Sequence, residues 1–530
     1  MLRRIILPAG TAASLSFMFF RHDPVHDNEN NNFSPNYWIK HLSDAFDAVK
    51  NGKQANYKIL RQLEESFIDG RLPSSTENNN IDEIDSSIWC LLALHKSPLT
   101  GLHKNKFVGK EYDDEKDFDE LLHKLKLDKI WTTALNWYSI NLCSEGDLGC
   151  EEKHLDAFKQ KPSKIQRLIS LMQVLLYRTE FDSCGKLIKQ GILQALLNIF
   201  QHYHESQKEL CQTVLKVIAN IAQDGKFCAD SIIDSEWYQL LAQLLIKPYY
   251  QEEEILSHKI FVNLLYSLGY ETHKLPPSIY EFYRPPPGVT PVMDIVFVHG
   301  LRGSAFRTWR QRDQKGVKTT QFWPRDWLHK DIHAPVRMLA LDYTSRLLQF
   351  NQVMETVTDR SRKMQQNFKY AGIGERPVIF ICHSMGGLLI KNMLLENDNL
   401  REKTVGILFM ATPHKGSPLA TAYSYDLLRP TEDVKLLREE NEINRKLHKD
   451  FLNVVDSIPI IVSVIEQKET PLFGKLRTFV TPESATFGRG AVFHLAENHH
   501  MICKPIDPSA PSYSIILNFV NDALHKIGQK

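Results

Sequence analysis

The chain has 530 residues, which is too long for a single hydrophobic core, so its length predicts two or more domains. Apolar residues make up 43% and charged residues 24% of the sequence, and this balance excludes a disordered protein and a protein with many membrane spans. The formal net charge of +1 provides no general basic surface, so the composition predicts no binding to nucleic acid.

The eight cysteines are far apart in the sequence. They show neither the paired spacing of zinc sites nor the density of a disulfide framework. We therefore expect buried thiols in a reducing compartment, and the sequence predicts no metal site and no cofactor.

Residues 1–21 predict a targeting or anchoring segment. Arg3 and Arg4 precede an uncharged stretch from Ile5 to Phe20, which falls short of the about 20 residues that cross a bilayer upright. A mitochondrial presequence, a short signal-anchor and a cleaved signal peptide all fit, and the lack of acidic residues favours mitochondria. We expect membrane attachment through this segment, followed by a flexible polar linker over residues 22–35.

Residues 36–274 predict an all-α domain, because apolar residues recur there at three- and four-residue spacing. Two passages within it echo each other, since the stretch around Asn220 returns about 43 residues later around Asn263. That offset is typical of armadillo and HEAT repeats, which stack to present an extended surface to a protein partner. Two similar passages are compatible with an armadillo-like domain that binds a protein partner. They are equally compatible with an irregular helical bundle.

A cluster of prolines over residues 275–291 predicts a stiff linker and a domain boundary. Over residues 292–530, short apolar runs then alternate with stretches of helical spacing. This alternation predicts an α/β fold with a mostly parallel sheet and helices on both faces. The predicted strands are residues 292–298, 336–341, 378–382, 405–410 and 459–465.

Ser384 lies between the apolar run 378–382 and a stretch with helical spacing. The sequence His383-Ser-Met-Gly-Gly in that position predicts a nucleophile elbow, a strained strand-to-helix turn that lifts a serine hydroxyl out of the sheet. An ordinary strand-to-helix turn is the alternative. Cys382 stands where the G-x-S-x-G pattern has its first glycine, and we expect this small residue to be tolerated.

The apolar run 292–298 ends in His299-Gly-Leu-Arg-Gly, where an α/β-hydrolase supplies the second oxyanion donor. We therefore predict an oxyanion hole made by the backbone N–H groups of Met385 and Leu301. The alternative is a glycine loop that only reverses the chain.

An acid and a histidine should follow the serine in this fold. The run 459–465 ends at Glu466, where a carboxylate can orient an imidazole, and Glu469 and Glu483 are weaker alternatives. Near the end of the chain, His499 is the preferred base and His500 the alternative. His494 lies in the preceding strand, and we expect it to be structural.

Two further regions bear on a substrate site. The insert over residues 417–455 combines charge with spaced leucines, and it fits either an amphipathic lid or a surface helical excursion. A set of aromatic residues fits either the core or an acyl pocket, and the core is the more frequent location for such clusters. These aromatic residues are Trp309, Phe322, Trp323 and Trp327.

These motifs together resemble the serine-active-site-containing (SERAC) family, a lipase-like branch of the α/β-hydrolase superfamily. The resemblance covers about 240 residues, and the helical N-terminal half and hydrophobic leader are also similar to that family's layout. In that family, these positions place Glu466 as acid and His499 as base. The matching segments are His299-Gly-Leu, His383-Ser-Met-Gly-Gly, Ala411-Thr-Pro-His with Gly416-Ser, Pro482-Glu-Ser-Ala, Asn498-His and Ile502-Cys-Lys-Pro.

The resemblance implies a membrane-associated protein at mitochondria and their contacts with the endoplasmic reticulum. It implies a phospholipid substrate, with a role in phosphatidylglycerol remodelling that affects cardiolipin composition and cholesterol trafficking. The residues themselves predict a serine esterase, lipase or acyltransferase that forms an acyl-enzyme on Ser384. The competing hypothesis is a non-catalytic scaffold, in which the helical half binds a partner and the hydrolase fold is structural.

Overall fold

The computed structural model describes residues 163–529, except 271–272, 286–288, 314–319, 344, 346–356, 422–430 and 473–474. Within these residues the chain forms a helical unit up to Lys274 and a hydrolase unit that begins at Leu275. The predicted anchor 1–21, the linker 22–35 and the predicted helical segment up to residue 162 lie outside the described residues. In the part of the chain that is described, no helix has the length and hydropathy that crossing a bilayer requires.

The helical unit buries apolar faces that recur at helical spacing. Its first described helix starts with a capping box, in which Ser163 and Gln166 satisfy each other's backbone N–H groups. The helices are α8 (Lys164–Phe181), α9 (Gly185–Lys189), α10 (Ile192–Tyr203), α11 (Lys208–Ala222), α12 (Lys226–Ile233), α13 (Trp237–Ile246) and α14 (Gln251–Ser267). The predicted helical character is confirmed for this part of the chain.

A structural period matches the offset seen in the sequence. Helices α9, α10 and α11 are followed by α12, α13 and α14 in the same order of increasing length. The buried Asn220 side chain donates to the Leu176 carbonyl at 3.4 Å, and the Asn263 side chain donates to the Ala219 carbonyl at 3.1 Å. In each contact the donor lies 44 residues after the acceptor. The second donor and acceptor lie 43 residues after the first pair. The armadillo-like class itself remains a prediction.

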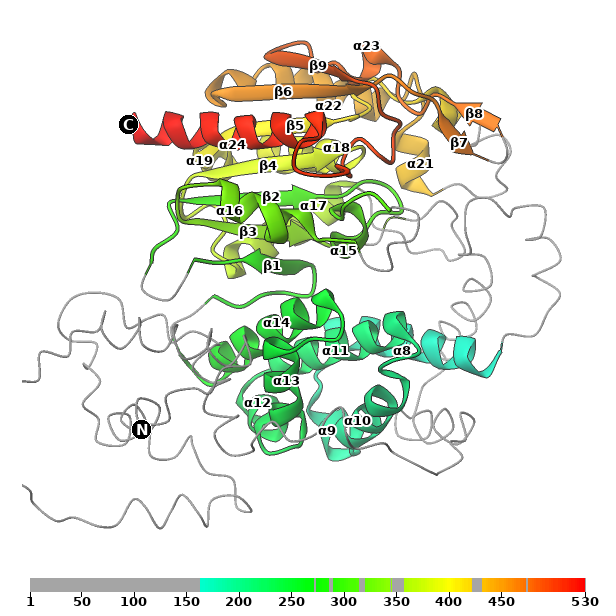
Figure 1. Ribbon diagram of the computed structural model, residues 1–530, viewed down its shortest axis with the longest axis vertical. Coiled ribbons are helices and arrows are strands. Elements are labelled where there is room, and N and C mark those ends of the chain that lie inside the picture. Colours follow the sequence, from blue (N-terminus) through cyan, green and yellow to red (C-terminus); the bar gives the residue numbers. More distant parts are fainter. Residues whose placement is uncertain are drawn as a thin grey trace, which may run out of the picture. The chain divides into compact units, whose positions relative to one another are not determined.

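The hydrolase unit contains a seven-stranded sheet in the order β1-β3-β2-β4-β5-β6-β9 (Figure 1). Every neighbouring pair is parallel except β1 and β3. The central strands are buried on both faces, which explains their continuous apolar runs. The strands are β1 (Ile279–Tyr283), β2 (Met293–Val298), β3 (Val336–Leu341), β4 (Val378–His383), β5 (Thr404–Met410), β6 (Ile460–Glu466) and β9 (Ala491–Leu495).

The predicted linker over residues 275–291 is wrong in part, because this segment contains β1. Strand β1 pairs with β3 from Ile279 to Tyr283 and closes one edge of the sheet. An edge strand tolerates prolines at its ends, since only one side of it takes part in the ladder. The boundary therefore falls at Leu275, and the hydrolase unit begins earlier than the predicted residue 292.

Helices cover both faces of this sheet. Helix α18 (Gly386–Glu396) packs on β4, with α17 (Val357–Tyr370) and α22 (Glu442–Leu452) beside it. Helix α24 (Pro511–Gly528), drawn in red in Figure 1, packs on β5 and β6. The shorter elements are α15 (Ala305–Thr308), η4 (Pro324–Leu328), α16 (His329–Asp331), α19 (Asp398–Lys403), α21 (Glu432–Leu436), η5 (Val455–Ser457), α23 (Pro482–Ala485) and the hairpin of β7 (Thr470–Leu472) and β8 (Lys475–Arg477).

The insert over residues 417–455 is described except for 422–430. Its base is closed by a hydrogen bond from the Ser417 N–H to the Leu437 carbonyl at 2.8 Å. Helix α21 is tied to α17 by the buried ion pair of Arg360 and Asp433. Helix α22 buries Leu447 and Phe451. This part of the insert therefore belongs to the helical layer over the sheet.

Candidate active site

Ser384 occupies a sharp turn between β4 and α18. Its φ angle is +53°, in the left-handed region that a residue with a side chain rarely adopts. The Ser384 N–H donates to the Met410 carbonyl of the neighbouring strand at 2.9 Å, and α18 begins two residues later at Gly386. The local geometry is that of the predicted nucleophile elbow.

Two glycines make this turn possible. A Cβ atom on Gly300 would lie 2.6 Å from the Ser384 Cβ, so only glycine allows the loop after β2 to approach the serine. A Cβ atom on Gly386 would lie 2.5 Å from the carbonyl oxygens of Val298 and His299. The start of α18 is therefore in direct contact with the end of β2. Cys382 is fully buried in β4 between its neighbours, so the missing first glycine is accommodated.

Ser384, His499 and Glu466 form one hydrogen-bonded chain. The Ser384 hydroxyl lies 3.0 Å from Nε2 of His499, and Nδ1 of the same ring lies 2.6 Å from Oε2 of Glu466. All three side chains are buried. In this arrangement the imidazole can accept the hydroxyl proton at Nε2, while the carboxylate holds Nδ1–H and stabilises the imidazolium.

The carboxylate of Glu466 is compensated by backbone donors. Its Oε1 atom accepts the N–H groups of Phe479 and Val480, each at 3.2 Å, while Oε2 faces His499. These contacts supply hydrogen-bond partners to both oxygens of a carboxylate that is buried away from water. Sequence reasoning did not find Phe479 or Val480, because no motif marks a loop that supplies only backbone N–H groups.

The loop that carries His499 has two further attachments. The His499 N–H donates to Oγ1 of Thr470, at the start of β7, at 3.0 Å. The ring of Phe479 stacks on the His499 ring, with centroids 4.6 Å apart and planes 13° apart. Residues from three segments thus hold the imidazole in one orientation. Thr470 and Phe479 carried no recognisable signal in the sequence.

The backbone N–H groups of Met385 and Leu301 have no acceptor among the described residues. Met385 caps the start of α18 directly after Ser384, and Leu301 follows the glycine that touches Ser384. Both N–H groups are available to a ligand oxygen near the serine.

The alternative acids and bases lie outside this chain of hydrogen bonds. Glu469 and Glu483 are exposed, and His494 is exposed on the edge strand β9. His500 packs edge-on against Phe479, and burial together with the charge of His499 lowers the pKa of His500 to about 3. The structure therefore brings together the preferred acid Glu466 and base His499 at Ser384, and it leaves the alternative residues outside this site.

The predicted aromatic set belongs to the core. Trp309 and Trp323 pack around Phe297 of β2, and Trp327 packs edge-on against Tyr513 of α24. Their side chains and that of Phe322 are buried. The core interpretation of these residues is supported, and nothing in these contacts forms an acyl pocket.

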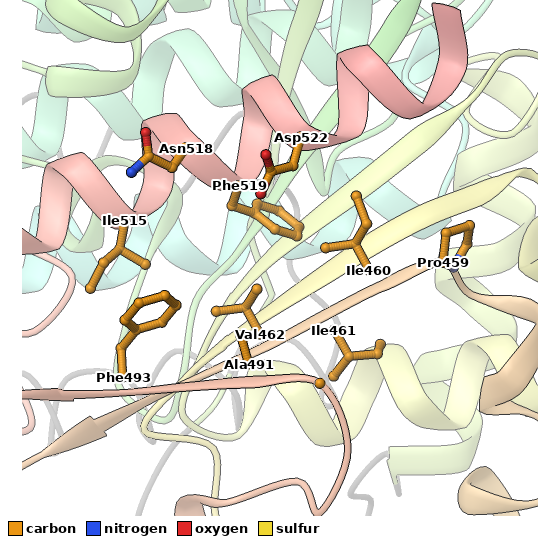
Figure 2. Close-up of a pocket in the computed structure, with 11 residues that line it drawn as sticks. Pro459, Ile460, Ile461, Val462, Ala491, Phe493, Ile515, Asn518, Phe519 and Asp522 are labelled. Atoms are coloured by element: carbon orange, nitrogen blue, oxygen red, sulfur yellow. The ribbon is translucent and has the colours of Figure 1, made fainter. Parts of the chain in front are cut away.

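An apolar pocket of about 310 Å³ lies between α24 and the starts of β6 and β9 (Figure 2). Glu466 and His499 follow the opposite, carboxyl ends of those two strands. The pocket is therefore separate from the Ser384 site. Its lining includes Ile460, Val462, Phe493, Ile515 and Phe519.

A second polar cluster lies behind the elbow. Lys391 of α18 is fully buried, and its Nζ atom has no hydrogen-bond partner among the described residues. Burial lowers the Lys391 pKa to about 7. Thr412 Oγ1, both ring nitrogens of His414 and Nδ1 of His448 also lack partners there, and burial with the nearby Lys391 lowers the pKa of both histidines. In the described part of the chain, no cluster of three or more His, Cys, Asp or Glu side chains is suited to a metal ion.

The sequence is also similar to known proteins. Residues 291–468 match the sequence profile of the PGAP1-like alpha/beta domain. Protein SERAC1 of Homo sapiens is 30% identical over 401 residues, and Protein SERAC1 of Danio rerio is 31% identical over 382 residues. The resemblance to the SERAC family is confirmed.

The similarity to the SERAC1 proteins covers 70% of this chain for the human protein and 67% for the zebrafish protein. In turn, the chain spans 60% and 57% of those two proteins. The sheet order and the matched domain establish the α/β-hydrolase fold of the C-terminal unit.

Among solved structures, Phospholipase PlaB from Legionella pneumophila aligns with a TM-score of 0.35 and 16% identity, over 44% of this chain and 62% of that one. The mature lipase BlEst2 from Bacillus licheniformis aligns with a TM-score of 0.33 and 19% identity, over 45% of this chain and 97% of that one.

Proposed function

We infer that the hydrolase unit is a serine esterase, lipase or acyltransferase in which Ser384 is the nucleophile, His499 the base and Glu466 the acid. One observation carries this inference: the Ser384 hydroxyl and the Glu466 carboxylate bind opposite nitrogens of His499, at 3.0 and 2.6 Å. The left-handed φ of Ser384 supports it, because strain of this kind is retained where the surrounding structure exposes a reactive group.

The reaction proceeds by acyl transfer. Ser384 Oγ attacks the ester carbonyl while His499 Nε2 takes the hydroxyl proton, and Glu466 stabilises the imidazolium. The tetrahedral intermediate collapses when His499 gives that proton to the leaving alcohol. Water, or the hydroxyl of another lipid, then attacks the acyl-enzyme with His499 again as base. The products are a free acid or a new ester, and Ser384 is regenerated.

The oxyanion would be bound by the N–H groups of Met385 and Leu301. The contact between Gly300 and Ser384 supports this assignment, since it brings the loop of Leu301 to the serine. Removing one oxyanion donor costs about 3 to 4 kcal/mol in the transition state. This loop therefore contributes about 10²- to 10³-fold to the rate through a single N–H group.

The substrate class that we propose is a phospholipid ester. Similarity to the SERAC1 proteins supports a lipid-directed hydrolase, and phosphatidylglycerol remodelling that affects cardiolipin and cholesterol trafficking extends that proposal. We place this activity at mitochondria and their contacts with the endoplasmic reticulum, with membrane attachment through residues 1–21. The repeated helices of the N-terminal half are the proposed surface for a protein partner.

A fluorophosphonate probe tests the catalytic assignment on the full chain. We expect a covalent adduct on Ser384 that is lost in Ser384→Ala and retained in Ser457→Ala, an exposed serine of η5. No adduct on the wild-type protein, under conditions that label a control hydrolase, would overturn the proposal. The scaffold hypothesis would then be favoured.

Lipid profiling separates the two hypotheses in cells. In cells that lack the protein, wild-type chain should restore the phospholipid profile and Ser384→Ala should not. Full rescue by Ser384→Ala would show that the protein acts as a scaffold. A change confined to phosphatidylglycerol and cardiolipin would identify the substrate class, and an unchanged profile with wild type would refute it.

A further inference from the structure

Phe479 contacts both His499 and Glu466. Its ring stacks almost parallel on the His499 imidazole, with centroids 4.6 Å apart, and its N–H donates to Oε1 of Glu466 at 3.2 Å. The same ring meets His500 edge-on. One residue thus fixes the plane of the base through its side chain and the position of the acid through its backbone.

The third group of Phe479, its carbonyl, connects to the insert. The Ser417 hydroxyl donates to this carbonyl in a short hydrogen bond, and the Ser417 N–H donates to the Leu437 carbonyl at 2.8 Å. Thr421 accepts the Glu439 N–H at 2.9 Å one turn further on. Ser417 therefore lies at the base of the insert. Phe479 connects Ser417 to the acid Glu466 and the base His499.

The backbone has little room to move at Gly416, where the start of the insert contacts residues 437–439. Gly416 has a φ of +97°, and a Cβ atom there would lie 2.5 Å from the Arg438 carbonyl oxygen. The ring of Phe479 also packs on the small buried cluster of Ile465, Val480 and Ala485. A displacement of Ser417 would therefore act directly on Phe479, and a movement of Phe479 would change its contacts to His499 and Glu466.

We propose that Phe479 is a positioning residue that holds His499 against Glu466 and couples this pair, through Ser417, to the base of the insert. The proposal deepens the proposed function and rests on it. The ring does not touch the reacting atoms. Its role is to keep the 2.6 Å bond between His499 and Glu466 formed while Ser384 is attacking.

The test compares Phe479→Leu, which loses the stacked ring, with Phe479→Tyr, which keeps it. We expect Phe479→Leu to slow fluorophosphonate labelling of Ser384 by about 10- to 100-fold, and Phe479→Tyr to label within about twofold of wild type. The control is Phe493→Leu, since Phe493 is 42% exposed on β9 away from the site. Equal slowing in the Leu and Tyr variants, in proportion to their loss of thermal stability, would overturn the proposal.

A double-mutant cycle tests the coupling to the insert. Ser417→Ala should slow labelling, and the double variant with Phe479→Leu should be slower than Phe479→Leu alone by no more than about twofold, because Ser417 is proposed to act on His499 through the ring that Phe479→Leu removes. Ser457→Ala is the control for loss of a hydroxyl. If the slowing in the double variant equals the product of the slowing in the two single variants, the coupling is overturned.

Proton NMR separates this proposal from the proposed function. The His499 Nδ1 proton, shared with Glu466, should give a strongly deshielded resonance that is weakened in Phe479→Leu and kept in Phe479→Tyr. This signal does not require turnover. If Ser384 is unreactive but the resonance behaves as expected, the catalytic assignment fails and the positioning role stands; if the resonance is the same in all variants, the positioning role fails.

Discussion

His383, the residue before the nucleophile, is bound through its ring Nε2 to the backbone carbonyl of His499 at 2.8 Å. Burial and the nearby His499 lower the pKa of His383 well below its ordinary value, so its ring is neutral and donates this proton. The elbow and the loop of the base are therefore joined directly, and not only through the Ser384 hydroxyl.

Replacing His383 with leucine should loosen the base. The His499 carbonyl would lose its donor in a buried position, which costs about 1 to 3 kcal/mol of stability. We expect labelling of Ser384 to slow about 10-fold, measured as a second-order rate with a fluorophosphonate. His494→Leu, at an exposed histidine of β9, should match wild type, and equal rates in the two variants would refute the role of His383.

Glu466→Gln should nearly abolish reactivity. The amide cannot stabilise the imidazolium and can favour the wrong tautomer of His499, and an equivalent change in a serine protease costs about 10⁴-fold in rate. The matched control is Glu469→Gln, an exposed carboxyl three residues away. Loss of labelling in the control and not in Glu466→Gln would reassign the acid.

Gly300→Ala should impair the site without unfolding the protein. The new methyl group would fall 2.6 Å from the Ser384 Cβ, so either the serine or the loop of Leu301 must shift. A displacement of about 1 Å can cost about 10²-fold in rate. Gly185→Ala is the control, because its nearest neighbour would be 3.8 Å away, and wild-type labelling of Gly300→Ala would contradict the close approach.

Lys391→Met should raise the thermal stability of the protein. Burial lowers the Lys391 pKa from 10.5 to about 7, so between these values the unfolded chain binds more protons than the folded chain. The destabilising contribution of Lys391 therefore shrinks as the pH increases from 7 towards 10.5, and the uncompensated lysine costs about 4 to 5 kcal/mol at pH 7.

The measurement for Lys391→Met is the melting temperature from pH 7 to pH 10. The variant should melt at a higher temperature than wild type at pH 7, and this difference should shrink as the pH rises to 10. The exposed Lys446 provides the control variant Lys446→Met, which should follow the wild-type curve. Destabilisation by Lys391→Met at pH 7 would show that the amine has a partner that compensates its burial.

Deleting residues 1–21 should release the protein from mitochondrial membranes. These residues hold the uncharged stretch that follows Arg3 and Arg4. The check is fractionation of cells that express the full chain or the truncated chain. Unchanged membrane association of the truncated chain would refute this segment as the anchor.

The sheet was predictable because a parallel strand buried on both faces is a continuous apolar run. The five strands expected from such runs appear within one or two residues of the predicted bounds. Strand β1 was missed because prolines flank its five residues, and a short edge strand between prolines has the composition of a linker. Its pairing with β3 depends on tertiary contacts that no local pattern records.

The site could be predicted from the order of serine, acid and histidine along the chain and from the elbow motif at Ser384. Glu466 and His499 follow the ends of strands, so the direction of a parallel sheet brings them to the same edge as Ser384. Phe479 stacks on the His499 ring and Thr470 accepts the His499 backbone N–H, and neither residue belongs to a sequence motif. Contacts made by one aromatic ring or one backbone N–H leave no trace in residue spacing, so no sequence pattern predicts these positions.

The two buried asparagines of the helical unit each donate to a main-chain carbonyl 44 positions earlier, and Asn220 also donates to the Thr179 hydroxyl at 3.1 Å. Every residue carries a carbonyl, so the acceptor persists whatever amino acid is substituted there. Insertion or removal of one complete 43-residue segment would leave the donors and acceptors matched, whereas a partial segment would break them. These two main-chain contacts therefore tolerate a change in the number of helix triplets in whole steps.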